Sequence, residues 1–557
     1  MDTQRLVLII AFLSSSLLLW EAWQRDYHQP LQPLTTNTIL NDTQIPFDDN
    51  SVQDQPDDLP SNLPTNTLNE QPTPLIQPAE IYSEAQSIHV ETDLLTLEIS
   101  TTGGDIRQAK LLHYPEATQT PEIPFQLLQD TGPNLFIAQS GLVSKDKLSS
   151  PNHYANYRVE QTDYRLQPGQ DKITVSLYWK NEQGVTVEKR FSFYRDSYRI
   201  DIDYLVNNQS ATPWDGRVYN QFQRRRQDTR ENTFIYTYTG GTLYSDAEKY
   251  EKIDFGDMDD EALSRNINGG WTAMIQHYFL AAWLPDQKQD NHYYSKALGN
   301  GRYSLGYSAP GIQIAPNSEG LLSTQLYIGP KEQARLEEIL PSLKLTVDYG
   351  ILTVIAQPLF WLLDVLHDLT SNWGWAIILV TLLIKLVFFK LSEASYRSMA
   401  HMRRIHPRLQ ALKERHGDDR QKMNQAMMEL YKTEKINPLG GCLPMLIQIP
   451  VFIALYWVLL ESVEMRQAPF ILWLQDLSAK DPYYILPLIM GVSMFIQQKL
   501  NPTPIDPIQQ KVMMVLPFIF TVFFAFFPAG LVLYWVVNNI LSITQQWYIT
   551  KKIEQQG

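Results

Sequence analysis

The sequence predicts a multi-domain membrane protein: an antiparallel β-sandwich followed by an α-helical transmembrane bundle that carries a helical hairpin. Two observations support this fold class. Residues 87–342 alternate apolar and polar side chains with period two, as half-buried strands do. From about Leu345 onward the chain is apolar and aromatic, with runs near the ~20 residues that a bilayer core requires.

Length, charge and cysteine content limit the number of domains and the kinds of function that the chain can have. A chain of 557 residues is too long for a single hydrophobic core. Its net charge of -14, without a domain-wide basic face, argues against direct binding of nucleic acid. The one cysteine, Cys442, lies in an apolar run beside two glycines, so we expect a small buried side chain rather than a redox or metal site. No cofactor is expected.

The N-terminal part contains an apolar run and an acidic spacer. Residues 6–23 could be a cleaved signal peptide. Trp20 and Trp23 at the outer end of the run, and the lack of a small-x-small cleavage site, favour an uncleaved signal anchor over residues 1–23. Residues 24–86 form a linker. Between Asp42 and Glu84 it has nine acidic residues, seven prolines and no Lys or Arg, which predicts disorder.

The β-sandwich is expected over residues 87–342. In "DKITVSLYWK" the apolar side chains fall on one face, and "VTVEKRFSFY" and "SYRIDIDYLV" repeat the alternation. No phosphate-binding glycine loop, HExxH or GxSxG motif occurs in it. The stretch "TTGGD" from Thr101 predicts only a turn. We therefore do not expect an enzyme.

Residues 343–372 predict an amphipathic helix on the membrane surface. Apolar residues recur at helical spacing, whereas Gln357, Asp364 and Asp368 lie largely on another side, and Pro358 bends the helix. A short spanning helix is the rival interpretation. It would put either the basic loop described next or the N-terminus on the wrong side of the membrane.

Five spans follow, one at 373–391 and four within 441–549, and the N-terminal anchor makes six. The four are expected at 441–460, 483–500, 512–527 and 531–549. The loop 392–440 carries ten Lys and Arg against six Asp and Glu, so the positive-inside rule makes it cytoplasmic. Both termini, including the short tail 550–557, are then cytoplasmic, and the β domain is periplasmic.

The cytoplasmic loop predicts a helical hairpin whose arms meet near Gly417. Its methionines, which include Met402 and Met427, form an adaptable apolar surface. Packing between the two arms and contact with client proteins are both open explanations.

Lys385 is an ammonium group inside the span 373–391. Either its long stem reaches the inner head groups, or its charge faces a water-filled cavity that opens to the cytoplasm. No Asp or Glu lies inside the four spans within 441–549 to pair with it. The spans do contain neutral polar residues that predict a hydrophilic pocket, namely Thr381, Gln448, Ser493, Gln497, Thr521, Asn538, Asn539 and Thr544.

Three motifs resemble one known family. "NPLGGCLPMLIQIPVFIALY", "RQAPFILWLQDLSAKDPYYILPLIMG" and "FPAGLVLYWVVNN", together with the order of parts, resemble the YidC membrane protein insertases of Gram-negative bacteria. The resemblance covers essentially the whole chain and is strongest after Asp348. It implies a core of five spans that inserts and folds newly made inner-membrane proteins without ATP.

The resemblance also implies site residues and partners. Lys385 matches a positive position, usually arginine, in a groove open to cytoplasm and lipid. Thr381, Tyr534 and Trp535 match substrate-contacting positions, and Gln448 and Asn538 would line the same groove. Clients or the translating ribosome would contact the hairpin at Met402, Arg403, Arg404 and Met427. The partners are nascent inner-membrane proteins, the Sec translocon, the ribosome and membrane lipids.

Three departures from the family pattern weaken parts of this expectation. Lysine replaces arginine at 385, Trp535 replaces a tyrosine, and the short tail argues against tail-mediated ribosome docking. A small-anion transporter or channel that binds its solute at Lys385 is the alternative function. An envelope enzyme with its site in the β domain is a second rival.

Overall fold

The structure is a computed structural model, and it describes residues 58–60, 86–144, 150–227, 237–416, 419–434, 443–501 and 507–556. The predicted anchor at 1–23 and most of the linker 24–86 lie outside these residues. Contacts divide the chain into two compact units, and the boundary lies between Thr346 and Val347, close to the predicted domain boundary at 342.

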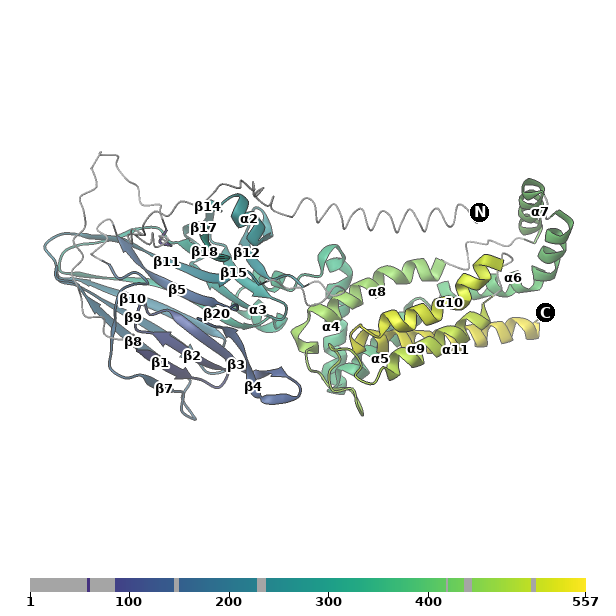
Figure 1. Ribbon diagram of the computed structural model, residues 1–557, viewed down its shortest axis with the longest axis horizontal. Coiled ribbons are helices and arrows are strands. Elements are labelled where there is room, and N and C mark those ends of the chain that lie inside the picture. Colours follow the sequence, from purple (N-terminus) through teal and green to yellow (C-terminus); the bar gives the residue numbers. More distant parts are fainter. Residues whose placement is uncertain are drawn as a thin grey trace, which may run out of the picture. The chain divides into compact units, whose positions relative to one another are not determined.

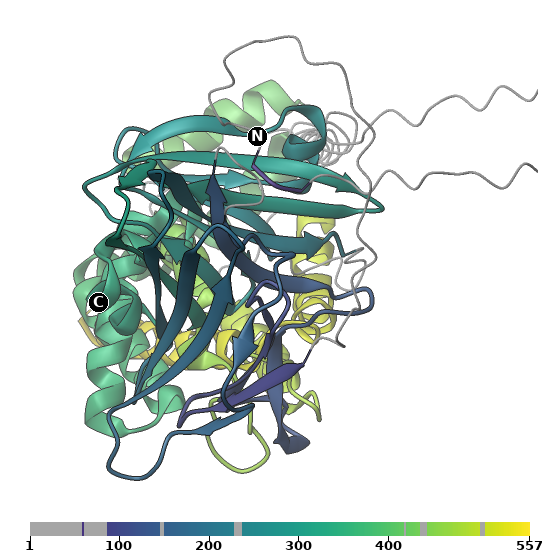
Figure 2. The same ribbon diagram turned by 90° about the vertical axis from the view of Figure 1, so that its left-hand side faces the viewer.

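The first unit contains two β-sheets, whose strands can be followed in Figures 1 and 2. The larger sheet has the order β14 (Ser264–Asn268), β17 (Asp290–Gly299), β18 (Arg302–Ser308), β11 (Trp214–Arg225), β5 (Phe136–Ser144), β3 (Ile106–Ala117), β2 (Leu95–Ser100), β1 (Ser87–Glu91) and β7 (Asp163–Arg165). Off this path, β19 (Ile312–Ile314) pairs with β11, and β4 (Thr120–Leu128) pairs with β3.

The smaller sheet has the order β13 (Lys249–Ile253), β12 (Gly240–Ser245), β15 (Trp271–Gln276), β16 (Phe279–Leu284), β20 (Ser318–Pro330), β10 (Arg199–Asn208), β9 (Val185–Tyr194), β8 (Lys172–Lys180) and β6 (Arg158–Val159). The short helices α2 (Phe255–Asp260) and α3 (Gln333–Ile339) complete the unit. Alternate side chains of β10 are buried, as the sequence predicts: Ile200, Ile202 and Tyr204 are fully enclosed.

One pairing departs from the predicted antiparallel arrangement. Strands β1 and β7 run parallel, with His89 opposite Asp163. Strand β7 reaches the edge of the sheet after a long connection and not through a hairpin, so no tight turn fixes its direction.

Polar side chains link the two sheets through the core. Lys189 on β9 is fully buried, and its Nζ donates to the carbonyls of Gly103 and Gly104 at 2.9 and 2.8 Å and to that of Ser140 at 2.8 Å. Gly103 and Gly104 are the glycines of the predicted "TTGGD" turn, and both have positive φ. The turn therefore also supplies two acceptors for a buried amine.

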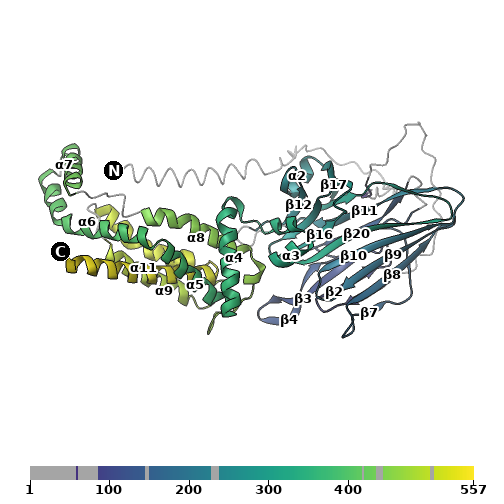
Figure 3. The ribbon, with the colours of Figure 1, turned by 180° about the vertical axis from the view of Figure 1, so that it is seen from behind.

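The second unit is helical. It contains α4 (Thr353–Thr370), α5 (Trp373–Val387), α6 (Phe389–His416), α7 (Arg420–Thr433), α8 (Leu443–Glu461), α9 (Ile485–Leu500), α10 (Pro507–Phe524) and α11 (Ala529–Gln556). Helices α5, α8, α9 and α11 run alongside one another, whereas α4 lies across them (Figures 1 and 3). The position of α4 on the membrane surface stays a prediction.

The helices differ in how well they fit a single membrane crossing. Among the described residues, only 350–370 is by itself long and apolar enough to span a bilayer. The predicted span at 373–391 is broken, because α5 ends at Val387 and α6 continues at an angle of 67°. Residues 448–461, 485–500 and 510–524 form shorter apolar helices. The number of spans stays a prediction.

A close contact between α9 and α10 gives a testable expectation. A Cβ on Gly491 would lie 2.0 Å from Oγ1 of Thr521. We expect Gly491→Leu to lower the thermal unfolding midpoint of the detergent-solubilised protein by about 2–10 °C, because over-packing costs roughly 1–3 kcal/mol. Val492→Leu, at a neighbouring position that is exposed, is the control. An unchanged midpoint in Gly491→Leu would contradict the tight contact.

Candidate functional site

Lys385 lies in the last turn of α5, and the start of that helix fixes its position. The side chain of Asn372 accepts a hydrogen bond from the amide of Trp375 at 3.2 Å. The side-chain Nδ2 of Asn372 also donates to the carbonyl of Phe470 at 3.2 Å. Gly374 leaves room for the Phe470 ring, which would meet any Cβ there at 2.0 Å. Helix α5 is therefore held at its first turn against the segment that follows α8.

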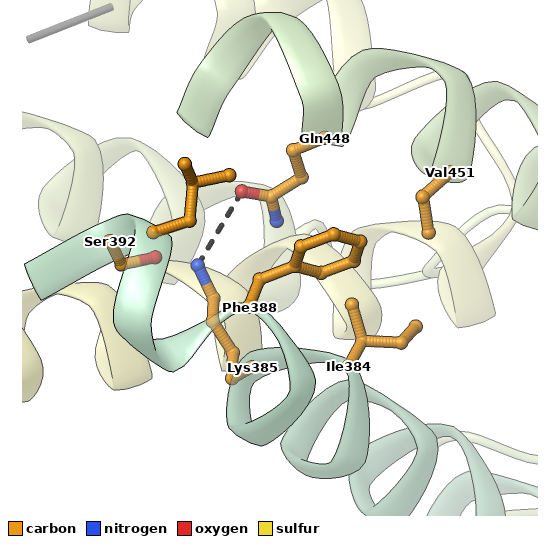
Figure 4. A pocket seen from close by; sticks show the side chains of 7 residues that line it. Ile384, Lys385, Phe388, Ser392, Gln448 and Val451 are labelled. Atoms are coloured by element: carbon orange, nitrogen blue, oxygen red, sulfur yellow. Dashed lines mark hydrogen bonds between the residues drawn. The ribbon is translucent and has the colours of Figure 1, made fainter. Parts of the chain in front are cut away.

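The amine of Lys385 donates to two neutral groups on other helices. It lies 2.7 Å from Ser542 Oγ on α11. It also lies 3.5 Å from Gln448 Oε1 on α8, a contact drawn in Figure 4. The network continues, because Gln448 donates to the side-chain oxygen of Asn538 and Ser542 donates to the carbonyl of Asn538 at 2.7 Å. Within the described residues, no carboxylate lies within 4.0 Å of the Lys385 amine.

A small pocket adjoins this amine. It encloses about 330 Å³, including space open to the outside, and is lined by Ile384, Lys385, Phe388, Leu391, Ser392, Gln448 and Val451. Figure 4 shows Lys385 and Gln448 facing each other across it from α5 and α8. Four of the seven lining residues are apolar, whereas Ser392 and Gln448 can donate or accept hydrogen bonds, so the pocket offers a cation among neutral side chains.

The structure brings together only part of the predicted site. Lys385, Gln448 and Asn538 belong to one hydrogen-bond network, as expected. Thr381 is buried and donates to the carbonyl of Ile377 in its own helix, and it does not line the pocket. Ser542 is not among the site residues predicted from the sequence, although it lies four residues after Asn538 and therefore on the same face of α11.

Tyr534 and Trp535 pack in an aromatic cluster instead of lining the pocket. The Tyr534 ring stacks on Phe452 with centroids 6.0 Å apart, and Trp535 meets the same ring edge-on at 4.6 Å. Trp535 also lies 5.1 Å from Phe524 of α10. These residues join α8, α10 and α11 through ring contacts.

The hairpin residues are engaged with the rest of the helical unit. Arg403 donates to the carbonyls of Lys499 and Leu500 at the end of α9, and Arg404 donates to that of Ile553 at 3.5 Å. Met402 and Met427 pack against the buried pair Ile405 and Leu409, between α6 and α7. The methionines thus take part in packing between the arms, and their contact with clients stays a prediction.

In the described part of the chain, no group of three or more His, Cys, Asp or Glu side chains is arranged to hold a metal ion.

Comparison with known proteins accounts for both units. The family model described as "YidC periplasmic domain" matches residues 87–362, and the one described as "60Kd inner membrane protein" matches residues 365–556. Relatives named "Membrane protein insertase YidC" align along the whole chain. The protein from Alkalilimnicola ehrlichii is 53% identical, with 100% of this chain and 96% of the relative covered.

A second relative and one solved structure were also matched. The relative from Methylococcus capsulatus is 52% identical, with 100% of this chain and 99% of the relative covered. A crystal structure described as an active YidC insertase covers 84% of this chain and 93% of its own, at 19% identity and a TM-score of 0.39. Because full-length relatives share about half of their residues with it, this chain belongs to the YidC family of inner-membrane protein insertases.

Proposed function

We propose that this protein inserts newly made inner-membrane proteins by receiving their polar segments in the pocket at Lys385, without ATP. The observation that carries the proposal is that, among the residues the structure describes, the Lys385 amine has only the neutral partners Ser542 and Gln448. An intramembrane cation without a carboxylate partner favours a negative or polar guest. A cation locked in an ion pair would have to break that pair first.

The proposed path begins in the cytoplasm. The polar tail of a client, often acidic, has to cross hydrocarbon that disfavours each charge by several kcal/mol. The polar side chains around Lys385 shorten the distance that the tail has to cross through hydrocarbon. The apolar helix of the client leaves into lipid along the aliphatic and aromatic faces of the helices, and its own burial in lipid drives insertion.

The topology and partners follow from the same proposal. Both termini and the hairpin of α6 and α7 lie in the cytoplasm, as the basic loop indicates, and the β domain lies in the periplasm. Nascent inner-membrane proteins are the substrates. The hairpin surface faces the translating ribosome, and the Sec translocon is a partner for larger clients.

Reconstitution into liposomes tests the activity directly. Purified protein should insert a single-span client with an acidic tail, made by translation in the absence of the Sec translocon. Removal of ATP after translation should not lower the inserted fraction. Empty liposomes are the control. Failure to insert, combined with uptake of a small anion such as phosphate, would favour the alternative of a transporter that uses Lys385 as its binding site.

A further inference from the structure

A second polar site lies in the β domain, around His153. The His153 side chain is buried, and its Nδ1 lies 2.6 Å from the hydroxyl of Tyr219. The backbone amide of His153 donates to the same hydroxyl at 2.9 Å. Tyr154 covers the imidazole, with ring centroids 4.2 Å apart. The remaining nitrogen, Nε2, points to a third group.

That third group is the carboxylate of Asp58, which belongs to the acidic linker. His153 Nε2 lies 3.0 Å from Asp58 Oδ1, and the hydroxyl of Tyr154 donates to the same oxygen. Asp58 is 8% exposed, and the next two residues of the described segment 58–60 are half-buried. A buried carboxylate that receives two hydrogen bonds is bound, and is not merely adjacent.

The pKa of Asp58 agrees with this binding. Burial alone raises the pKa of the carboxyl. The hydrogen bond and charge of His153, and the hydrogen bond from Tyr154, outweigh burial and bring the pKa below its ordinary value of 3.8. The ionised carboxylate is therefore the form that this site holds at neutral pH.

Two glycines shape the site. A Cβ on Gly141 would lie 2.9 Å from the hydroxyl of Tyr219, and a Cβ on Gly103 would lie 2.4 Å from the carbonyl oxygen of His153. Backbone hydrogen bonds also fix the segment 151–155, which carries His153. The amide of Gly103 donates to the carbonyl of Ala155 at 2.7 Å, and the amide of Leu142 donates to that of Pro151 at 2.8 Å. The position of the imidazole is therefore set by the β domain and not by the linker.

We propose that His153, Tyr154 and Tyr219 form a binding site for a carboxylate on a peptide segment, and that its resident ligand is Asp58 of the chain's own linker. Tyr219 orients the imidazole, and His153 and Tyr154 donate to the ligand. Attachment at Asp58 leaves residues 24–57, instead of 24–85, between the predicted membrane anchor and the first described contact with the β domain. The proposal does not depend on the Lys385 pocket.

Hydrogen–deuterium exchange of the full-length protein in nanodiscs tests the attachment. Asp58→Ala should speed exchange in peptides that cover residues 58–60 and 150–157 by roughly tenfold, because it removes the hydrogen bonds from His153 and Tyr154 to a charged carboxylate. Asp57→Ala removes the same charge one residue earlier and should leave both peptides at the wild-type rate. Unchanged exchange in Asp58→Ala, or equal effects of the two variants, would overturn the proposal.

A peptide added in trans tests the pocket separately. A synthetic peptide of residues 55–62 at millimolar concentration should restore slow exchange at 150–157 in Asp58→Ala, and the same peptide with alanine at position 58 should not. His153→Phe should abolish the restoration while the thermal unfolding midpoint shows that the domain still folds. His153→Gln, which keeps a donor near Nε2, should retain part of it. Equal restoration by both peptides would refute a carboxylate site.

Discussion

Lys385→Glu is expected to reduce the insertion of clients with acidic tails by roughly tenfold or more. The substitution exchanges an attraction for a repulsion, and each is worth about 1–4 kcal/mol for charges 4 Å apart, depending on the local dielectric. The measurement is the protected fraction of a single-span client in liposomes, and growth after depletion of the native protein. Lys385→Arg keeps the charge and should be nearly silent.

Two control variants test whether the effect depends on the charge at position 385 and not on any reversed charge in this part of the chain. Lys390→Glu makes the same reversal five residues later, where the side chain is 92% exposed and ion-paired to Glu393 at 3.8 Å. It should insert clients at close to the wild-type rate. Ser542→Ala removes the nearest partner of the amine and should give a smaller loss than Lys385→Glu. If Lys385→Ala and Lys385→Glu both sustain growth, the pocket charge has no role in insertion.

Lys189→Ala is expected to destabilise the β domain by about 3–5 kcal/mol. It leaves a cavity in the core and three buried carbonyls without their donor. The measurement is the urea midpoint of the full-length protein, followed by the fluorescence of the buried Trp271 and Trp283. Lys172→Ala, at an exposed position of β8, should change the midpoint little. A wild-type midpoint in Lys189→Ala would show that the amine is dispensable.

The same lysine makes stability depend on pH. Burial lowers the pKa of Lys189 to about 7, against 10.5 for the ordinary side chain, and the charge of Asp105 offsets part of that effect. Between these values the unfolded chain binds more protons, so the free energy of unfolding rises with pH, by at most about 1.4 kcal/mol per unit. Burial also raises the pKa of Tyr157 and Tyr204, so their ionisation in the unfolded chain lowers the free energy of unfolding near pH 10 and limits the Lys189 slope to roughly pH 7–9. Lys189→Met should remove this slope, and an identical slope in both proteins would contradict it.

The sequence predicts the parts of this protein that depend on local periodicity. The alternation around Ile200 predicts β10 because burial of one face requires it. The same alternation places Lys189 on the buried face of β9, between Val187 and Phe191. Its three acceptors are not predictable in this way, because two come from a turn and one from β5, which only the packing of the two sheets brings together.

In the candidate sites, too, local sequence predicts some residues but not the contacts that depend on packing. Lys385 and Gln448 are conspicuous as polar residues in apolar runs, so composition alone selects them. The contact with Ser542 depends on how far α11 is shifted along α5, which no local pattern encodes. Asp58 and His153 are 95 residues apart in the sequence, and no motif around either residue predicts its contact with the other.

The break after Val387 has a consequence for the tolerance of a lone cation. The C-terminal end of a helix carries about half a negative charge, because its last carbonyls lack amide partners, and this effect is confined to the last turn. Lys385 stands in that last turn because α5 stops two residues later. In an unbroken helix the same lysine would lie in mid-helix, away from any terminus. The bend therefore supplies diffuse electrostatic support for an ammonium that has no carboxylate within 4.0 Å among the described residues.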